Sequence, residues 1–165
     1  MDQKFTKLSV STEFEVYASE KDLNAEENAL LQSAQAAMRN AYAPYSNFSV
    51  GAAILLANGE IVIGNNQENA AYPSGLCAER VAIFHASATF PGVVIKAIAV
   101  CCKAQDSVLE TPVPPCGACR QVIAEYETKQ DKHIRIIMQG EKGKVYVSES
   151  IGSLLPLMFN RKYLK

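Results

Sequence analysis

Two short cysteine-containing stretches constrain this chain more than any other feature of its sequence. One spans residues 77–80 (CAER) and the other spans residues 115–120 (PCGACR). Two cysteines three positions apart can reach one ion when the second lies in the first turn of a helix, and a thiol from another helix start completes a set of three ligands. Three protein ligands with one open position are typical of catalytic zinc, whereas structural zinc is usually held by four. We therefore expect Cys77, Cys116 and Cys119 to bind zinc.

Two charged residues beside Cys77 have expected roles around that ion. Glu79 lies two residues after the cysteine, so its carboxylate is near the metal without having to bind it, where a proton shuttle belongs. Both cysteine stretches fall at predicted helix starts, whose free amides and dipoles stabilise thiolates. Arg80 is expected to donate to a thiolate sulfur and tune the ligands without touching a substrate.

Length and composition limit the class of protein. A chain of 165 residues suits one domain with a real core. The formal net charge is −1 and basic residues are not concentrated anywhere, which argues against a nucleic-acid groove. No apolar run is long enough to cross a membrane and the start of the chain lacks a signal-peptide core, so we expect a cytoplasmic protein without a membrane partner. Five reduced thiols are expected there, with Cys101 and Cys102 as buried strand residues.

Hydrophobic periodicity predicts an α/β domain over residues 24–165, preceded by an N-terminal arm over residues 1–23. The segment 1–22 is predicted to be an arm or an edge strand. The expected helices and strands follow in the order helix 24 to before Pro44, strands 48–56 and 61–63 joined by Asn58-Gly59, helix 77–88, strand 93–102, helix 116–127, strands 134–138 and 145–147, and a short helix capped by Ser148 and ended by Pro156. This order favours a three-layer α/β/α arrangement with a mixed sheet of about five strands.

The cysteine stretches resemble the zinc deaminases of the cytidine deaminase superfamily, with Cys77 standing where other branches carry histidine. Further motifs narrow the resemblance to the short, three-cysteine, homotetrameric cytidine deaminases. The resemblance covers roughly residues 24–160. The motifs are residues 45–48 (YSNF), 50–53 (VGAA), 66–72 (NQENAAY) and 154–156 (LLP) followed by Phe159.

The resemblance implies a cytidine deaminase-like fold and a function. The reaction would be zinc-dependent hydrolytic deamination of cytidine and deoxycytidine to uridine and deoxyuridine, releasing ammonia, in pyrimidine salvage. Glu79 would move protons between the attacking water, ring N3 and the departing amine. The implied substrate contacts are Phe48 packing on the base, Asn66 and Glu68 on the ribose hydroxyls, the backbone of Ala78 on the base edge, and Tyr72 and Phe159 reaching a neighbouring subunit of the homotetramer.

Four alternatives stay open at this stage. Another small-molecule aminohydrolase of the same fold, such as a blasticidin deaminase, would share the zinc site. The pair Cys116 and Cys119 alone also fits a thiol oxidoreductase. A structural zinc module would need a fourth ligand, and neither His85 nor His133 has a ligand spacing to the cysteines. A deaminase acting on polynucleotides is disfavoured because the chain lacks a basic surface signal.

Overall fold

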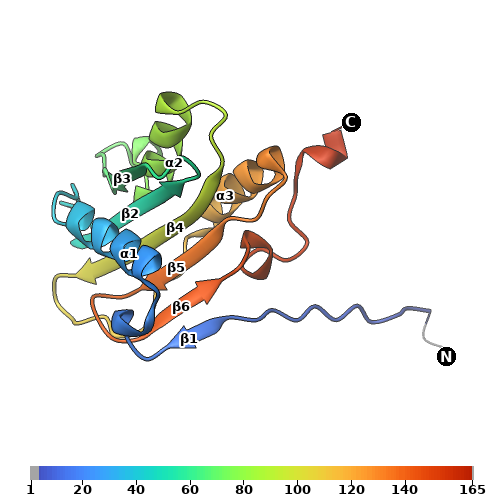
Figure 1. Cartoon of the computed structure of the whole chain (residues 1–165), viewed down its shortest axis with the longest axis horizontal. Coiled ribbons are helices and arrows are strands. Elements are labelled where there is room, and N and C mark those ends of the chain that lie inside the picture. Colours follow the sequence, from blue (N-terminus) through green and yellow to red (C-terminus); the bar gives the residue numbers. More distant parts are fainter. Residues whose placement is uncertain (1–3, 165) are drawn as a thin grey trace.

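A six-stranded mixed sheet forms the centre of the protein, for which a computed structural model describes residues 4–164. The strand order is β1-β6-β5-β4-β2-β3, and only β4 and β5 are parallel neighbours (Figure 1). The strands are β1 (Glu15–Tyr17), β2 (Phe48–Leu56), β3 (Ile61–Asn65), β4 (Ile95–Ala104), β5 (Arg135–Gln139) and β6 (Val145–Ser148). The helices are α1 (Ala25–Met38), α2 (Ala78–Thr89) and α3 (Gly117–Gln130), with short 3-10 helices at Glu20–Asp22, Tyr72–Ser74, Ile151–Ser153 and Arg161–Leu164.

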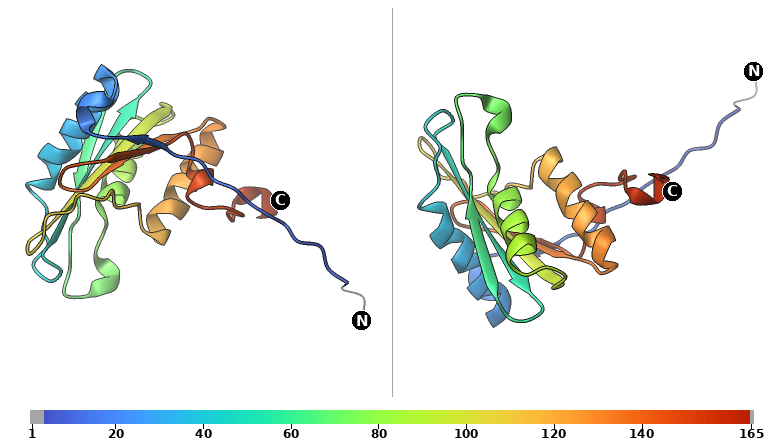
Figure 2. Two further views of the ribbon diagram at one scale, coloured as in Figure 1. Left: turned by 90° about the horizontal axis from the view of Figure 1, so that it is seen from below. Right: turned by 90° about the horizontal axis from the view of Figure 1, so that it is seen from above.

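The sheet is covered by helices on both faces, which confirms the predicted three-layer α/β/α arrangement. Helix α1 lies on one face, whereas α2 and α3 lie on the other (Figure 2). Each face has its own apolar cluster, one including Leu30 and Leu31 of α1 and the other including Ile83 of α2 and Ile123 of α3. Strand β4 is buried between these clusters, as its continuous apolar run predicts. The sheet has six strands rather than about five because β1 of the N-terminal segment adds to β6.

Local sequence signals place the starts of the three helices. The Asn24 side chain accepts a hydrogen bond from the Glu27 amide at 2.9 Å, so it caps α1 as predicted. Cys77 and Cys116 occupy the cap positions of α2 and α3, and neither side chain bonds to its own helix as a cap. Both thiols are therefore free to point toward another group.

Two predicted helix boundaries are wrong. Helix α1 ends at Met38, well before Pro44, and the chain then turns so that the Tyr42 amide donates to the Asn66 carbonyl. The short helix near the C-terminus is capped by Ser150 rather than Ser148, and it ends at Ser153. Ser148 is instead paired within the sheet, opposite Ile136, and its hydroxyl donates to the Ser150 carbonyl at 2.7 Å.

Helix α2 lies unusually close to β3, and this contact positions the first cysteine stretch. A Cβ atom on Gly64 would lie 2.6 Å from the Ala82 amide nitrogen and 2.7 Å from the Ala78 carbonyl oxygen. Glycine at this position therefore permits the helix backbone to rest directly on the strand. The start of α2, and with it Cys77, is held against the sheet by this approach.

The N-terminal segment satisfies buried groups of the sheet before it leaves the body of the molecule. The fully buried amide of Gln139 donates to the Glu20 carboxylate at 2.7 Å and accepts from Gln35 at 3.0 Å. Residues 4–14 are exposed and run away from the sheet (Figures 1 and 2). The division into an arm (1–23) and a domain (24–165) stays a prediction. Within residues 4–164, no helix has the length and apolar character needed to cross a lipid bilayer.

Candidate active site

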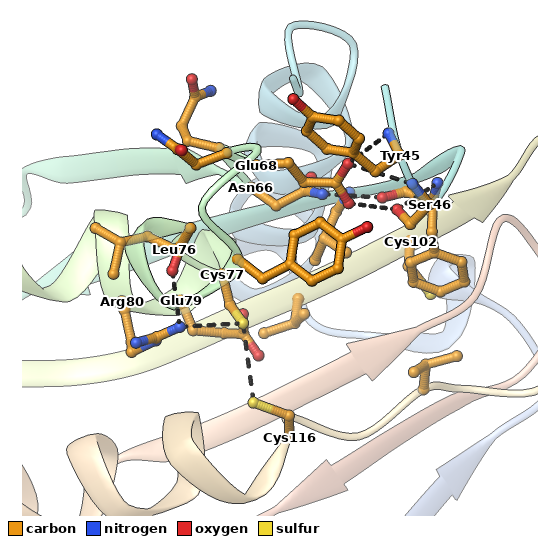
Figure 3. Close-up of a pocket in the computed structure, with 18 of the residues that line it drawn as sticks. Tyr45, Ser46, Asn66, Glu68, Leu76, Cys77, Glu79, Arg80, Cys102 and Cys116 are labelled. Carbon is orange, nitrogen blue, oxygen red and sulfur yellow. Dashed lines mark hydrogen bonds between the residues drawn. The ribbon is translucent and has the colours of Figure 1, made fainter. Parts of the chain in front are cut away.

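The three cysteines predicted to bind metal converge on one point from two helix starts. Their sulfur atoms all lie within 4.8 Å of one another. The distance is 3.8 Å between Cys77 and Cys116 (Figure 3) and 3.5 Å between Cys116 and Cys119. A tetrahedral ion with metal–sulfur bonds of about 2.3 Å separates its sulfur ligands by about 3.8 Å. The arrangement thus fits zinc. Among residues 4–164 no other His, Cys, Asp or Glu side chain joins this group, so the fourth ligand of a structural site is not found there.

The protein alone favours one thiolate in this cluster. Hydrogen bonding from the Cys119 thiol and the Arg80 guanidinium lowers the pKa of Cys77 to about 5, and Arg80 Nη2 lies 3.7 Å from the Cys77 sulfur. The same bond to Cys77, together with burial, raises the pKa of Cys119. A divalent cation would supply the positive charge that ionises the remaining thiols.

Glu79 is a buried carboxyl group on the first turn of α2. Only 4% of its surface is exposed, and Figure 3 shows its side chain beside Cys77. Burial raises the pKa of Glu79, and the neighbouring Cys77 charge raises it further. A carboxyl group with a raised pKa accepts and returns protons near neutral pH more readily than an ordinary one. Its position and environment suit a proton shuttle.

A cavity of about 720 Å³ opens beside the sulfur cluster. Its lining includes most of the residues predicted for the site, namely Phe48, Asn66, Glu68, Tyr72, Cys77, Glu79, Arg80 and Cys116. Cys119 lies buried behind this wall. The cavity volume falls within the range of about 300–1,000 Å³ found for small-molecule sites.

Two of the predicted substrate contacts do not line this cavity. Ala78 is fully buried at the start of α2. Phe159 is 56% exposed and stacks on Tyr163 near the C-terminus. Tyr72 lines the cavity but is 75% exposed, and its ring meets Tyr45 edge-on. The rings of Tyr72 and Phe159 are thus left largely open to solvent in their own subunit.

Asn66 holds the backbone of β2 rather than pointing freely into the cavity. Its side-chain oxygen accepts from the Val50 amide at 2.8 Å, and its side-chain nitrogen donates to the Phe48 carbonyl at 2.9 Å. Each end of the amide retains one further hydrogen-bonding position. Asn66 therefore fixes the strand that carries Phe48 and can still contact a ligand.

Glu68 is oriented by Ser46, a residue whose role the sequence reasoning missed. The Ser46 hydroxyl donates to the Glu68 carboxylate at 2.5 Å, and the Tyr45 amide donates to its other oxygen at 2.9 Å. The Ser46 hydroxyl also accepts from the Phe48 amide at 3.1 Å. These bonds, with that from Ser46 the largest, lower the pKa of Glu68. A serine two residues before Phe48 is a local turn signal that could have indicated the bond to the Phe48 amide.

The remaining cysteines and both histidines lie where the sequence predicted or outside the site. Cys101 and Cys102 are buried on β4, and Cys102 also lines the cavity. Burial raises the pKa of Cys102 to about 11, so this thiol stays neutral at physiological pH. His85 and His133 are exposed.

Comparison with known proteins identifies the family. Residues 24–132 match the family described as the cytidine and deoxycytidylate deaminase zinc-binding region. A cytidine deaminase of Halalkalibacterium halodurans is 44% identical over 132 residues, covering 79% of this chain and 91% of the relative. A cytidine deaminase of Sporosarcina psychrophila is 40% identical over 136 residues, covering 82% of this chain and 92% of the relative.

Solved structures agree with this match. The crystal structure of a cytidine deaminase from Burkholderia pseudomallei superimposes with a TM-score of 0.69 at 43% identity, covering 79% of this chain and 97% of that chain. A Mycobacterium tuberculosis cytidine deaminase gives a TM-score of 0.63 at 33% identity, covering 82% and 98%. Together with the cysteine cluster, these similarities show that the chain belongs to the cytidine and deoxycytidylate deaminase family of hydrolytic enzymes.

Proposed function

We propose that this protein hydrolyses cytidine and deoxycytidine to uridine and deoxyuridine, with release of ammonia, at a zinc site formed by Cys77, Cys116 and Cys119. The observation that carries the proposal is the convergence of three sulfurs and a buried carboxyl group beside one nucleoside-sized cavity. The names of the relatives, which are cytidine deaminases, support the nucleoside as substrate.

The chemistry divides between the metal and Glu79. Cys77, Cys116 and Cys119 would hold the zinc ion, which would supply the Lewis acidity that lowers the pKa of water from about 15.7 toward about 7. Glu79 would take one proton from the attacking water and deliver it to ring N3. It would then take the proton of the hydroxyl added at C4 and deliver it to the amine, so that the C4–N bond breaks, ammonia leaves and the C4 carbonyl of uridine remains. One carboxyl group can serve each step because it alternates between base and acid. The burial that raises its pKa keeps it ready for both roles.

The opposite wall of the cavity orients the nucleoside. Phe48 packs on the base, while Asn66 and Glu68 bind the ribose hydroxyls with a donor and acceptors. Ala78, whose side chain is buried, contributes backbone groups at the start of α2. Ser46 holds the Glu68 carboxylate and the Phe48 amide together, so it positions two substrate contacts without needing to touch the substrate.

We further propose a cytoplasmic homotetramer that acts in pyrimidine salvage. The exposure of Tyr72 and Phe159 supports subunit contacts in which each ring enters a neighbouring site. All five cysteines are free thiols, which fits a reducing compartment. The partner at the site is a small nucleoside rather than a nucleic acid.

The direct test measures zinc and turnover in one sample. We expect one zinc ion per chain and a decrease of cytidine absorbance with time. Treatment with a chelator should remove the zinc and abolish the deaminase activity. One zinc ion without deamination of cytidine, deoxycytidine or cytosine would favour another aminohydrolase of the same fold, such as a blasticidin deaminase. A folded, metal-free protein with a reducible bond between Cys116 and Cys119 would favour a thiol oxidoreductase.

Replacing Glu79 by glutamine removes the proton shuttle while keeping the size of the side chain. The turnover number should fall by about two to four orders of magnitude, whereas zinc content should stay at the wild-type level. Glu125→Gln, an exposed position on α3, is the matched control and should retain full activity. Near-normal turnover of zinc-loaded Glu79→Gln would exclude the role.

Replacing Arg80 by methionine removes the guanidinium beside the Cys77 sulfur. We expect zinc affinity to fall by about 10- to 100-fold, because groups that support metal ligands typically contribute this much. Competition with a chromophoric chelator measures it. Arg120→Met is the control, since Arg120 donates to the carbonyls of Pro115 and Leu154 rather than to sulfur. Equal zinc affinities in both variants would contradict the role of Arg80.

Replacing Ser46 by alanine removes one hydrogen bond to the Glu68 carboxylate. The Tyr45 amide still donates to the other carboxylate oxygen, so the carboxylate is loosened rather than freed, and KM for cytidine should rise several-fold with a smaller change in kcat. Ser46→Thr keeps the hydroxyl and should restore KM. The effect of Ser46→Ala should shrink with 2′,3′-dideoxycytidine, which lacks the 2′ and 3′ hydroxyls. Ser49→Ala on the neighbouring strand is the control. A kcat defect with unchanged KM would count against this assignment.

A further inference from the structure

Residues 6–14, the part of the N-terminal segment that precedes β1 and that we now call the arm, have the pattern of a strand that continues beyond β1. From residue 6 to residue 16, apolar residues and threonines alternate without interruption with serines and charged residues. Such alternation indicates a strand with one face buried and the other in water. One face carries Thr6, Leu8, Val10, Thr12, Phe14 and Val16, and the other carries Lys7, Ser9, Ser11, Glu13 and Glu15.

Among residues 4–164, only the last part of this strand pairs with another strand of its own chain. Residues 15–17 pair antiparallel with β6, with Glu15 opposite Val147 and Tyr17 opposite Val145. Strand β6 ends at Ser148, and the chain then turns into the short helix at Ile151–Ser153. The arm therefore extends beyond the end of β6, and its Leu8 and Val10 side chains are 78% and 54% exposed. A single strand with an apolar face is not stable in water without a further strand beside it.

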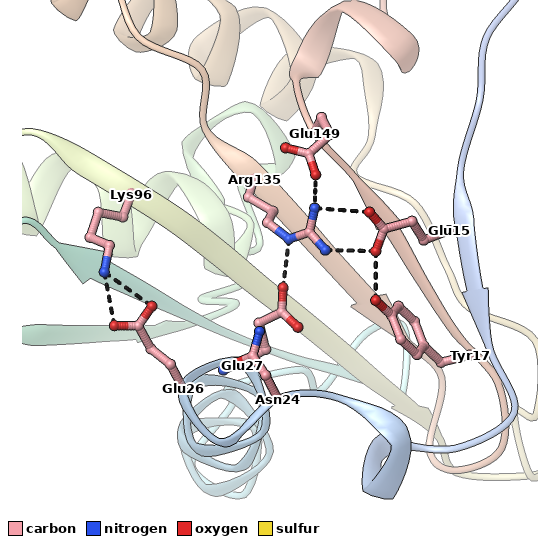
Figure 4. A network of polar contacts seen from close by, with 8 residues as sticks. All are labelled: Glu15, Tyr17, Asn24, Glu26, Glu27, Lys96, Arg135 and Glu149. Atoms are coloured by element: carbon pink, nitrogen blue, oxygen red, sulfur yellow. Dashed lines mark hydrogen bonds and ion pairs between the residues drawn. The ribbon is translucent and has the colours of Figure 1, made fainter.

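The residues around Glu15, where the arm joins the sheet, carry an excess of negative charge. Arg135 forms ion pairs with Glu15 at 2.7 Å, with Glu27 at 2.5 Å and with Glu149 (Figure 4). Three carboxylates thus share one guanidinium, and no other ion pair of these carboxylates occurs within residues 4–164. The neighbouring Lys96 pairs with Glu26 instead. A further cation beside Glu15 would be electrostatically favourable.

We propose that the arm pairs antiparallel with the same arm of a second copy of this chain, with the two Ser11 residues opposite each other. In this register Lys7 lies opposite Glu15 and adds its charge to the acidic cluster around Arg135. Leu8 lies opposite Phe14, so the apolar faces of both strands coincide. The contact is self-complementary about a two-fold axis, and it is separate from the proposed exchange of Tyr72 and Phe159.

Other registers are less complementary. A shift by one residue places the apolar face of one arm beside the polar face of the other. A shift by two in either direction keeps the apolar faces together but moves Lys7 opposite Glu13 or Tyr17, so the charge of Lys7 no longer lies opposite Glu15 of the cluster. Within the described part of the chain, the edge that the second copy would use is free, because β1 is the last strand of the sheet and pairs only with β6.

The apolar face of the arm lies on the side of the sheet that α3 covers, and this side also suits a contact between copies. Val16 lies opposite Tyr146, which packs against the cluster that includes Ile123 of α3. The C-terminal segment leaves the sheet on that side (Figure 2), and its Leu157 and Leu164 are 81% and 74% exposed. Pairing of the arms would bring these apolar groups of both copies together.

Cysteine substitutions at two matched positions test the register. Opposite residues in an antiparallel pair have Cα atoms about 4.5–5.5 Å apart, which permits a disulfide. The two Ser9 residues would be offset by four positions, roughly 13 Å along the strands. Mild oxidation of the zinc-loaded Ser11→Cys protein should therefore yield a disulfide-linked dimer, whereas Ser9→Cys and the wild type should stay uncrosslinked on a non-reducing gel.

Equal cross-linking of Ser9→Cys and Ser11→Cys, or none in either, would overturn the proposed pairing. A charge reversal then tests the contact with the acidic cluster. In the Ser11→Cys background, Lys7→Glu should slow disulfide formation several-fold, and more at low salt than at high salt. Lys4→Glu carries the same charge change at a position outside the Lys7–Glu15 pair and should have a smaller effect. Equal slowing by both reversals would contradict the contact with Glu15.

Discussion

Three sulfur atoms must meet at one point for this fold to hold a metal, and two helix starts bring them there. Cys77 begins α2 and Cys116 begins α3, while Cys119 follows in the first turn of α3. Both helices cover the same face of the sheet, and their positive N-terminal ends lie beside the three thiols. Arg80 adds a further positive charge at the Cys77 sulfur. When the three thiols are ionised they repel one another, and the two helix N-termini together with the Arg80 guanidinium offset this repulsion.

The opposite wall of the cavity is also tied to the backbone that carries it. Asn66 and Ser46 both bond to the backbone of β2 at Phe48, and Ser46 also holds Glu68. The polar groups that face a ligand are thus linked to the strand that carries the aromatic ring. A site built in this way keeps its geometry before a substrate arrives, which lowers the conformational cost of binding.

The segment before residue 24 lies outside the family match, yet it completes the sheet. Glu20 satisfies the buried Gln139 amide, and Glu15 pairs with Arg135. Within the described part of the N-terminal segment, the residues before β1 make no strand pairing in their own chain. This contrast separates a part of the N-terminus that stabilises one subunit from a part that we assign to contact between subunits.

The sequence by itself determined the features that depend on neighbouring residues. The Asn24 cap, the apolar run of β4, the hairpin at Asn58-Gly59 and the helix starts at both cysteine stretches are local, and short-range backbone chemistry specifies them. The two cysteine stretches also indicated the family, because their combination with the further motifs at residues 45–53 and 66–72 is more specific than the Cys116–Cys119 pair alone. Local signals were weaker where two similar residues competed, as with Ser148 and Ser150 for the last cap.

Only the tertiary structure decided which distant residues meet. Cys77 lies 39 positions from Cys116, and their contact depends on the crossover that places α2 and α3 on one face. The bond between Ser46 and Glu68 spans 22 positions, and the pairing of β1 with β6 joins the N-terminal segment to a strand near the C-terminal end of the chain. Such contacts follow from the order of strands in the sheet rather than from any local pattern. Short motifs therefore indicate the chemistry of this chain, whereas the strand order determines the geometry that makes the chemistry possible.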